Sequence, residues 1–199
     1  MRFKTKLNNE SKNIVNVNQK EQFWKKYHEE NDKPYMFSTT IKKAVKDLNI
    51  SSVLEVGCGF GNNLKSFDNV EATGVDISDY AIKIAKQRFP NFRFLIGNAL
   101  KIPLQESFDL VLTSAVLEHI KPDLVKSAME ELFRLSKKYI LNIEAYDNTE
   151  HEINWHRGKG TFWTLHMAKR WQNFPVTVLS DYDVDDEYRL TLVVKRDSV

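Results

Sequence analysis

Short apolar runs alternate along this chain with stretches in which apolar residues recur at helical spacing. The apolar runs predict five strands, at Ser52–Val56, Val70–Asp76, Phe92–Ile96, Phe108–Thr113 and Tyr139–Ile143. Helices are predicted before and between them, at Glu21–Tyr27, Thr40–Leu48, Phe60–Phe67, from Ser78 to Pro90 and from Pro122 to Leu135. Because strands that alternate with helices form right-handed βαβ units, the pattern predicts an α/β fold with a largely parallel sheet.

The end of the chain breaks this alternation. Asp147–Gly160 is a long polar stretch rich in His, Trp and Arg, which is typical of a loop with a function, and Thr161–Gln172 predicts a helix. Two more strands are predicted at Val176–Leu179 and Tyr188–Lys195. The connection between them is too short for a parallel crossover, so they are expected to pair as an antiparallel hairpin. The acidic residues of that connection are predicted to form a solvated loop: Asp181, Asp183, Asp185, Asp186 and Glu187.

Length and charge suggest one domain with a short extension. With 199 residues and 42% apolar residues, the chain can bury one substantial core. We expect residues 1–20, which carry five basic residues and one acid, to be a flexible arm, and residues 21–199 to be a single domain. Within that domain, 21–49 is predicted to be a helical cap and 147–172 a lid over the substrate.

Composition limits the classes of binding partner and the cellular compartment that we expect. A net charge of +2 gives no general reason to expect nucleic acid or an anionic membrane as partner. The single cysteine, Cys58, excludes internal disulfides and multi-cysteine zinc clusters. No apolar run approaches the length of a membrane span or a signal core, so a cytoplasmic protein is expected. The oligomeric state is left open.

The chemistry is expected at the turn after the first strand, Glu55-Val56-Gly57-Cys58-Gly59-Phe60-Gly61. Its glycines allow positive φ and the close approach of a ligand, and a helix opening from Asn62 would direct free N–H groups at that ligand. A dinucleotide fingerprint would place its third glycine at position 62, and a phosphate-binding P-loop would end in glycine, lysine and a hydroxyl residue. Neither pattern is present. The turn therefore favours another nucleoside ligand.

Two polar residues follow the next strands. Asp76 ends the second strand, 17 positions after Gly59, where a carboxylate can accept both hydrogens of a ribose diol, and Asn98 follows the third strand, where it can meet an adenine edge. Open α/β sheets bind ligands at the carboxyl ends of their strands. The glycine turn, Asp76 and Asn98 are therefore expected to form one site.

Four segments in order resemble the motifs of class I S-adenosylmethionine-dependent methyltransferases: Glu55–Gly61, Gly74–Ser78, Gly97-Asn98-Ala99 and Phe108–Ile120. The resemblance implies a Rossmann-like sandwich with a mostly parallel seven-stranded sheet, an antiparallel C-terminal hairpin and an N-terminal helical cap. It also implies S-adenosyl-L-methionine as cofactor and S-adenosyl-L-homocysteine as product. The cofactor contacts implied are Glu55, Gly57, Cys58, Gly59 and Gly61 in the turn, Asp76 and Ile77 at the ribose, Asn98 and Ala99 at the adenine, and Ser114.

The whole chain is more loosely similar to small methylases associated with the biosynthesis of pseudaminic acid and other surface sugars. The similarity lies in Phe23-Trp24, in Ser136–Glu144 and in Trp155-His156-Arg157-Gly158. It implies a sugar or sugar nucleotide as the methyl acceptor.

The catalytic residues are expected after the fourth strand and in the lid. If the acceptor is a hydroxyl, a general base is useful, and His119, His151 and His156 are the candidates. If it is a carboxylate or phosphonate oxygen, no base is needed and Arg157 is the candidate clamp. Trp24 and Tyr27 are candidates to close over the cofactor. No metal site is predicted, because His151 and His156 lack a third well-spaced ligand.

Three functions remain open at this point. The first is methyl transfer to O or N of a small molecule, and it is favoured because the chain lacks two motifs of nucleic-acid methylases, a Pro-Cys pair and Asn/Asp-Pro-Pro-Tyr after the fourth strand. The second is a protein or RNA methyltransferase, which the basic arm supports. The third is a non-catalytic cofactor-binding subunit. The acceptor itself is not identified.

Overall fold

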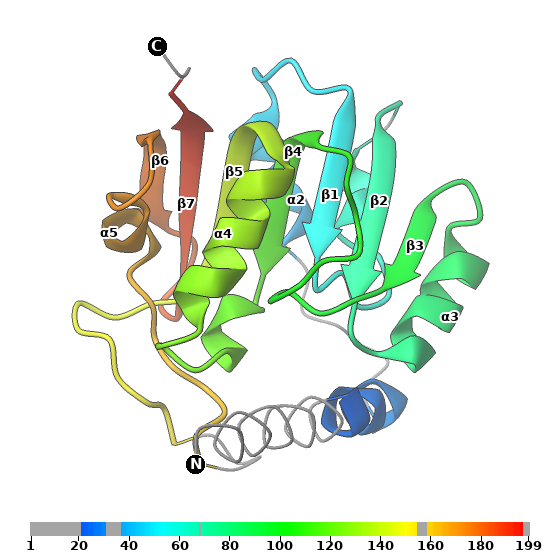
Figure 1. Ribbon diagram of the computed structural model, residues 1–199, viewed down its shortest axis with the longest axis horizontal. Coiled ribbons are helices and arrows are strands. Elements are labelled where there is room, and N and C mark those ends of the chain that lie inside the picture. Colours follow the sequence, from blue (N-terminus) through cyan, green and yellow to red (C-terminus); the bar gives the residue numbers. More distant parts are fainter. Residues whose placement is uncertain (1–20, 31–36, 68, 155–158, 197–199) are drawn as a thin grey trace, which may run out of the picture.

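Seven strands form one sheet in the order β3-β2-β1-β4-β5-β7-β6 in the computed structural model, which describes residues 21–30, 37–67, 69–154 and 159–196 (Figure 1). The strands are β1 (Ser52–Val56), β2 (Glu71–Asp76), β3 (Arg93–Ile96), β4 (Phe108–Ser114), β5 (Ser136–Ala145), β6 (Val176–Asp183) and β7 (Tyr188–Lys195). The helices are a helix at residues 21–30, α2 (Ser38–Val45), α3 (Asp79–Arg88), α4 (Val125–Leu135) and α5 (Met167–Trp171), with 3₁₀ turns η1 (Leu64–Ser66) and η2 (Leu117–His119). Residues 1–20, the predicted arm, lie outside the described residues.

The sheet confirms the predicted topology. β1 pairs in parallel with β2 and β4, β2 with β3, and β4 with β5. β7 is antiparallel to both β5 and β6, so the expected C-terminal hairpin is confirmed. β1 is buried along its whole length, as expected for a central parallel strand covered on both faces.

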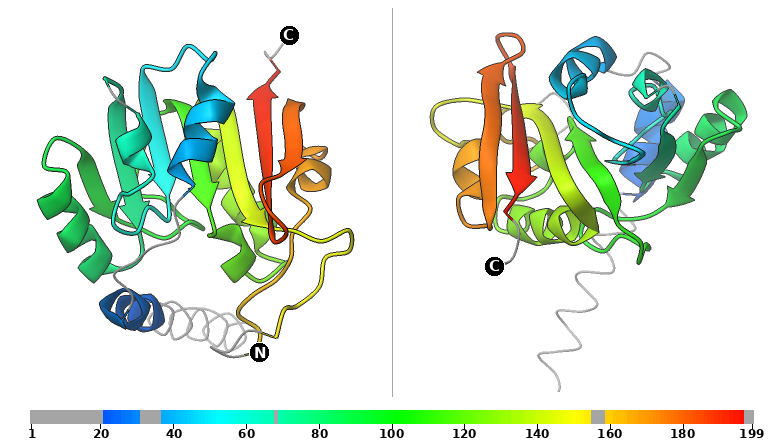
Figure 2. Two further views of the ribbon diagram at one scale, coloured as in Figure 1. Left: turned by 180° about the vertical axis from the view of Figure 1, so that it is seen from behind. Right: turned by 90° about the horizontal axis from the view of Figure 1, so that it is seen from above.

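Helices cover both faces of the sheet (Figure 2). One buried cluster joins α2 and α3 to the sheet through side chains such as Ile41 and Ile82, and a second joins α4 and α5 through Met129 and Trp171. In α3 the predicted N-cap is confirmed, because the Ser78 hydroxyl accepts a hydrogen bond from the Ala81 N–H at 3.2 Å. The result is a three-layer α/β sandwich.

The predicted helix at Phe60–Phe67 is wrong. The segment contains only the 3₁₀ turn η1, between irregular turns. Gly61 and two asparagines, Asn62 and Asn63, are poor helix formers in this stretch. In addition, the Asn63 amide is used elsewhere: it donates to Glu55 Oε1 at 2.9 Å and accepts from the Phe37 N–H at 3.0 Å. These bonds fasten the segment to β1 and to the start of α2 instead of letting it coil.

The predicted helix at Thr161–Gln172 begins later than expected. Residues before Met167 are extended because their N–H groups bond across the chain: Trp163 donates to the Glu118 carbonyl at 2.9 Å and Leu165 to the Ala145 carbonyl at 2.7 Å. Only α5 is helical, and Trp171 in it is fully buried. The range predicted as lid therefore contains both a surface loop and a core element.

The acidic hairpin loop is shorter than predicted. β6 continues through Asp183, and only 184–187 connect it to β7. Arg189 pairs with Asp181 at 2.8 Å and with Asp183 at 2.6 Å, so these two acids belong to the ladder and are not part of a solvated loop.

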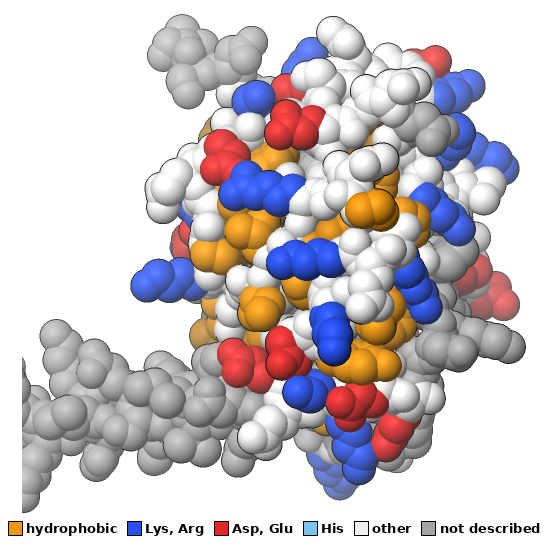
Figure 3. All heavy atoms as spheres, turned by 90° about the vertical axis from the view of Figure 1, so that its right-hand side faces the viewer, with side chains coloured by type: hydrophobic (Ala, Val, Ile, Leu, Met, Phe, Trp, Pro, Cys, Tyr) orange, Lys and Arg blue, Asp and Glu red, His pale blue; other side chains and the backbone are white. Residues whose placement is uncertain are grey.

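The side of the molecule that carries β3 and α3 shows apolar side chains between lysines and arginines (Figure 3). Ile96, at the end of the edge strand β3, is 55% exposed. No helix in the described ranges is long and apolar enough to cross a bilayer.

Candidate active site

The candidate site lies at the carboxyl ends of the parallel strands. Figure 1 shows β1, β2, β4 and β5 pointing toward the helix at residues 21–30, which lies across this edge of the sheet and which we call the cap helix. Open α/β sheets bind ligands at this edge. The turn after β1, the ends of β2 to β4 and the cap helix therefore form the walls of the site.

The glycine turn has the geometry that its sequence predicts. Gly57, Gly59 and Gly61 have φ of 74°, 49° and 77°, a region that favours glycine. A Cβ on Gly57 would lie 2.2 Å from Val116 Cγ2, so this position also lacks space for a side chain. The Gly57 and Cys58 N–H groups both donate to the Val75 carbonyl, at 2.7 and 3.0 Å, which holds the turn against β2.

Asp76 is fixed against this turn. Its Oδ2 accepts from the Gly59 N–H and its Oδ1 from the Ser78 N–H, both at 2.8 Å. A carboxylate oxygen has two lone pairs, so each oxygen can accept one bond more. The arrangement presents a buried, oriented carboxylate that can accept two hydroxyl groups of a ribose.

Glu55 lies below the turn and is fully buried. Its Oε1 accepts from Asn63, whereas its Oε2 is buried without a hydrogen-bond partner among the described residues. Burial raises the pKa of Glu55 to about 8, and the nearby charge of Asp76 acts in the same direction. An unpartnered buried carboxyl oxygen is costly, which is consistent with a site that is completed by a ligand or its ordered water.

Cys58 is a packing residue in this geometry. Its Sγ lies 2.7 Å from the place where Gly74 would carry a Cβ, and burial raises the pKa of its thiol. A buried neutral thiol is a poor nucleophile.

The remaining predicted cofactor residues lie at the ends of neighbouring strands. The Gly97 N–H donates to the Asp76 carbonyl at 2.9 Å, which brings the loop with Asn98 and Ala99 beside the end of β2, where Ile77 follows. The Asn98 Oδ1 accepts from the Leu100 N–H at 2.9 Å, so this side chain also shapes its own loop. Ile77, Asn98 and Ala99 are half-buried, as is Ser114 at the end of β4, the last predicted cofactor contact.

A chain of buried polar groups, which the sequence did not reveal, shapes the loop after β4. Trp171 Nε1 donates to Asn142 Oδ1, Asn142 Nδ2 donates to Thr113 Oγ1, and the Thr113 hydroxyl donates to Glu144 Oε1, at 2.7, 2.8 and 2.6 Å. Glu144 Oε2 in turn accepts from three successive N–H groups, those of residues 116 to 118. At the start of this loop Ala115 has φ of 55°, a strained value for a residue with a side chain.

His119 is placed where the loop after β4 meets the surface part of the predicted lid, residues 147–166, which we call the lid. Its Nδ1 lies 2.9 Å from the Thr161 carbonyl oxygen, and since a carbonyl only accepts, Nδ1 carries the hydrogen. In the neutral ring Nε2 then has the lone pair; it lies 3.5 Å from Glu118 Oε1. The ring stacks on Phe162 and meets the edge of Trp24 from the cap helix.

Glu118 and Glu144 form a buried acidic pair beside this ring. Burial raises the pKa of both carboxyl groups, and for Glu118 the charge of Glu144 raises it further. Four hydrogen bonds to Glu144 oppose this shift, whereas the bonds to Glu118 come from the Ala145 N–H and the Tyr188 hydroxyl. Glu118 is therefore the group of the pair that keeps its proton.

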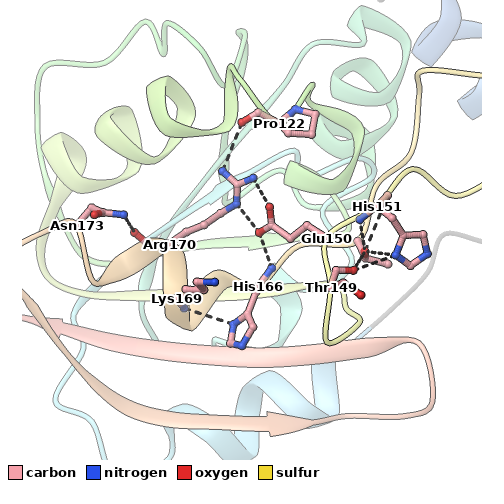
Figure 4. A network of polar contacts seen from close by, with 9 residues as sticks. Pro122, Thr149, Glu150, His151, His166, Lys169, Arg170 and Asn173 are labelled. Carbon is pink, nitrogen blue, oxygen red and sulfur yellow. Dashed lines mark hydrogen bonds and ion pairs between the residues drawn. The ribbon is translucent and has the colours of Figure 1, made fainter.

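The lid is fastened at its base (Figure 4). Arg170 of α5 donates from Nε and Nη2 to the two carboxylate oxygens of Glu150, at 2.7 and 2.6 Å, and the His166 N–H donates to the same carboxylate. His151 is half-exposed, and its ring nitrogen Nδ1 contacts the Thr149 carbonyl and the Thr164 hydroxyl. These contacts place His151 at the base of the lid, while His156 and Arg157 lie outside the described residues.

The cap helix carries a site residue that the sequence analysis missed. His28 packs on Phe60, with ring centroids 5.2 Å apart, and its Nε2 lies 3.4 Å from the position of a Cβ on Gly59. The signal for it was present, because Trp24, Tyr27 and His28 have the i, i+3, i+4 spacing of one helix face. Within the part of the chain that the structure describes, no group of three or more His, Cys, Asp or Glu residues is arranged to hold a metal ion.

Comparison with known proteins points to one family. The family model described as "Methyltransferase domain" matches residues 53–139, which run from β1 into β5. An uncharacterized methyltransferase of Alkaliphilus oremlandii is 29% identical over 89 residues. A tRNA (carboxymethyluridine(34)-5-O)-methyltransferase of Arabidopsis thaliana is 35% identical over 89 residues. These matches cover 42% and 44% of this chain and 41% and 22% of the relatives, less than two thirds of either.

Solved structures show the same fold. The 1,6-didemethyltoxoflavin-N1-methyltransferase of Burkholderia thailandensis, solved with its small-molecule substrate and S-adenosylhomocysteine, superimposes with a TM-score of 0.67 at 17% identity. The superposition covers 80% of this chain and 77% of that one.

Proposed function

We propose that this chain, whose residues 53–139 match the family model of a methyltransferase domain, is an S-adenosylmethionine-dependent methyltransferase. The observation that carries the proposal is the carboxylate of Asp76, which two N–H groups orient against the glycine turn. A class I fold, a turn without space for a side chain at Gly57 and an oriented acid after β2 together suit a nucleoside with a ribose diol.

The described residues fit this cofactor. We assign its amino-acid part to the turn from Gly57 to Gly61, its ribose to Asp76 and Ile77, and its adenine to the loop with Asn98 and Ala99. The unpartnered Oε2 of Glu55 below the turn supports the assignment, because a cationic ammonium group nearby would stabilise the ionised carboxylate. When bound, the cofactor supplies an electrophilic methyl group on a sulfonium.

Loss of the carboxylate tests the cofactor assignment. Asp76→Ala is expected to reduce the affinity for S-adenosylhomocysteine at least tenfold in titration calorimetry, because hydrogen bonds to a charged group are worth about 1.5–3 kcal/mol. Asp186→Asn, an exposed acid of the hairpin, is the matched control and should leave the affinity unchanged. Wild-type affinity in Asp76→Ala would contradict the proposal.

The acceptor we infer is the O or N atom of a small molecule. Trp24 of the cap helix and Phe162 of the lid both pack on His119, so the site is covered from two sides, and covered sites suit small acceptors. The Burkholderia enzyme of the same fold is named for a small acceptor. A sugar or sugar nucleotide is the acceptor that the sequence resemblance favours.

His119 is the candidate general base for a hydroxyl acceptor. The Thr161 carbonyl holds the hydrogen on Nδ1, so Nε2, which lies 3.5 Å from Glu118 Oε1, is the nitrogen that can take a proton. His151, and His156 and Arg157 in the undescribed part of the lid, remain candidates for the same task or for holding an anionic acceptor. Incubation with labelled cofactor and fractionated cell extract, followed by mass spectrometry, would identify the product that gains a methyl group.

A protein or RNA acceptor is the alternative, and one surface favours it. Four lysines, Lys42, Lys43, Lys46 and Lys65, line a groove of about 480 Å³ between α2 and η1. The Arabidopsis relative is named for a tRNA substrate. RNA binding that weakens steeply with salt, and that is lost when these lysines are replaced by glutamate, would favour this alternative over a small acceptor.

A further inference from the structure

The cap helix crosses the site and contacts both of its ends. At one end Lys25 pairs with Asp79, the first residue of α3, at 3.4 Å. At the other end, Trp24 packs on His119 in the loop after β4, with ring centroids 4.8 Å apart. Between these contacts His28 lies on the glycine turn. The helix therefore bridges the site from the start of α3 to the loop after β4.

His28 is buried at the turn with an unused nitrogen. The residue is 9% exposed, and its Nδ1 makes no hydrogen bond of normal geometry with any described residue, although the Trp24 carbonyl lies one helical turn earlier. Nε2 faces Gly59, 3.4 Å from the place of its missing Cβ. A buried polar atom without a partner is rare in proteins, so the ring is incompletely bonded at Nδ1, and Nε2 is the nitrogen that faces the turn.

His28 is the polar side chain that lies nearest to the glycines of the turn. The side chains nearest to its three glycines are Val116, His28, Phe94 and Phe89, and of these only His28 carries a hydrogen-bond donor. The buried carboxyl groups close by are those of Glu55 and Asp76. The amino-acid part of the proposed cofactor carries a carboxylate as well as an ammonium group. The acids suit the ammonium group, and the carboxylate requires a donor on the other side of the turn.

We propose that His28 binds the α-carboxylate of the cofactor's amino-acid part, and that the cap helix thereby closes over the bound cofactor. This inference rests on the proposed function. It adds a cofactor contact from outside the parallel-sheet motifs, which makes the cap helix part of the binding site and not merely a cover.

The bond gives cofactor affinity a dependence on pH. Burial lowers the pKa of His28, and the charge of Asp76 opposes that shift. A carboxylate beside the ring favours the imidazolium, so binding takes up a proton and affinity falls as pH rises. The other charged groups on the elements around His28 are Arg88, whose guanidinium lies over the Phe60 ring on which His28 packs, and the Lys25–Asp79 pair. Glu55, with its pKa of about 8, also titrates in this range, so its contribution must be subtracted.

Two ligands and two variants test the proposal. S-adenosylhomocysteine has the amino-acid part, whereas 5′-methylthioadenosine lacks it. We expect His28→Phe, which keeps a ring against Phe60, to weaken S-adenosylhomocysteine binding at least tenfold and to leave methylthioadenosine binding within twofold of the wild type. His28→Gln, which keeps a neutral donor, should bind S-adenosylhomocysteine with intermediate affinity. Between pH 6 and 8 the affinity of His28→Gln for S-adenosylhomocysteine should change less than that of the wild type, because only Glu55 then contributes to the pH dependence.

Controls distinguish a failure of this inference from a failure of the proposed function. Lys26→Gln, an exposed change on the same helix, should behave as wild type with both ligands. Methylthioadenosine binding shows that each variant has a folded site. Wild-type protein that binds neither ligand would overturn the cofactor assignment and the inference with it. If the wild type binds both ligands, any of three results would overturn the role of His28 alone. The first two are that His28→Phe leaves S-adenosylhomocysteine binding unaffected or weakens both ligands equally. The third is that His28→Gln has the same pH profile as the wild type.

Discussion

At the scale of single residues, the glycine turn combines a backbone requirement with a lack of space. Gly57 and Gly160 both have φ above 70°, but a Cβ would meet Val116 at 2.2 Å in the first case and nothing within 4 Å in the second. The two positions therefore separate the cost of the backbone conformation from the cost of the contact.

We expect Gly160→Ala to lower the free energy of unfolding by about 1–2 kcal/mol, the cost of a left-handed conformation with a side chain. Gly57→Ala should cost more, because Val116 must also move, and it should abolish S-adenosylhomocysteine binding. Urea denaturation of both variants gives the comparison. Equal losses in the two would show that the contact with Val116 costs nothing.

Glu55 predicts a pH dependence of stability. Its pKa in the folded state, about 8, lies above the ordinary value of 4.5, so the folded protein holds a proton that the unfolded chain releases. Its contribution to the free energy of unfolding therefore decreases as pH rises from about 4.5 to about 8. Glu55→Gln removes this titration.

The variant is expected to gain stability relative to the wild type as pH rises from 5 to 8, measured by urea denaturation at both values. A difference between the two proteins that stays constant with pH would contradict the raised pKa of Glu55. Changes shared by both proteins come from other groups, Glu118 and Glu144 among them.

At the scale of elements, α5 is linked to the loop after β4 by side-chain hydrogen bonds that pass through two strands. Trp171 in α5 donates to Asn142 on β5, which donates to Thr113 on β4, and the sequence of bonds ends at Glu144 and the N–H groups of the loop. Every side chain in this series is buried, so its polar groups cannot bond to water and bond to one another instead. The loop that carries His119 is held by this chain of bonds.

Trp171→Phe removes the first donor and leaves Asn142 Oδ1 buried without a partner. We expect a loss of about 1–3 kcal/mol in the free energy of unfolding. A double-mutant cycle with Asn142→Ala should give a coupling energy of about 1 kcal/mol, because the two residues act through one bond. Additive effects would show that the loss comes from packing alone.

At the scale of the whole molecule, the lid and the cap helix meet at His119 while each is fastened elsewhere. The lid is held at its base by the two bonds between Arg170 and Glu150, and the cap helix is held at α3 by Lys25. Side chains from two distant parts of the chain, Trp24 and Phe162, thus pack on the His119 ring.

Arg170→Met is expected to speed hydrogen exchange in residues 147–154 while leaving exchange in β1 and β4 unchanged, because it opens the base of the lid without exposing the core. Arg93→Met, which removes an ion pair with Glu106 at the exposed edge of the sheet, is the control and should not affect the lid. Exchange measured by mass spectrometry resolves these segments. Faster exchange across the whole sheet would contradict a local role for Arg170.

The sequence by itself determined the sheet, its antiparallel end and the place of the glycine turn. The periods of apolar residues are local, and so are the glycines, the cap at Ser78 and the acid at Asp76, so these features can be inferred from neighbouring positions. The wrong helix at Phe60–Phe67 and the late start of α5 have the same cause: their backbone or side-chain groups bond to residues distant in the chain, which no local pattern records.

Only the tertiary structure decided what surrounds the turn. The unpartnered atoms of Glu55 and His28, the strained Ala115 and the buried pair of Glu118 and Glu144 depend on contacts between elements far apart in the sequence. The position of His28 was the hardest to infer, because a histidine on an apolar helix face has the same local pattern whether it fills a core or faces a ligand. Burial and the direction of its two nitrogens distinguish these cases, and both are properties of the folded chain.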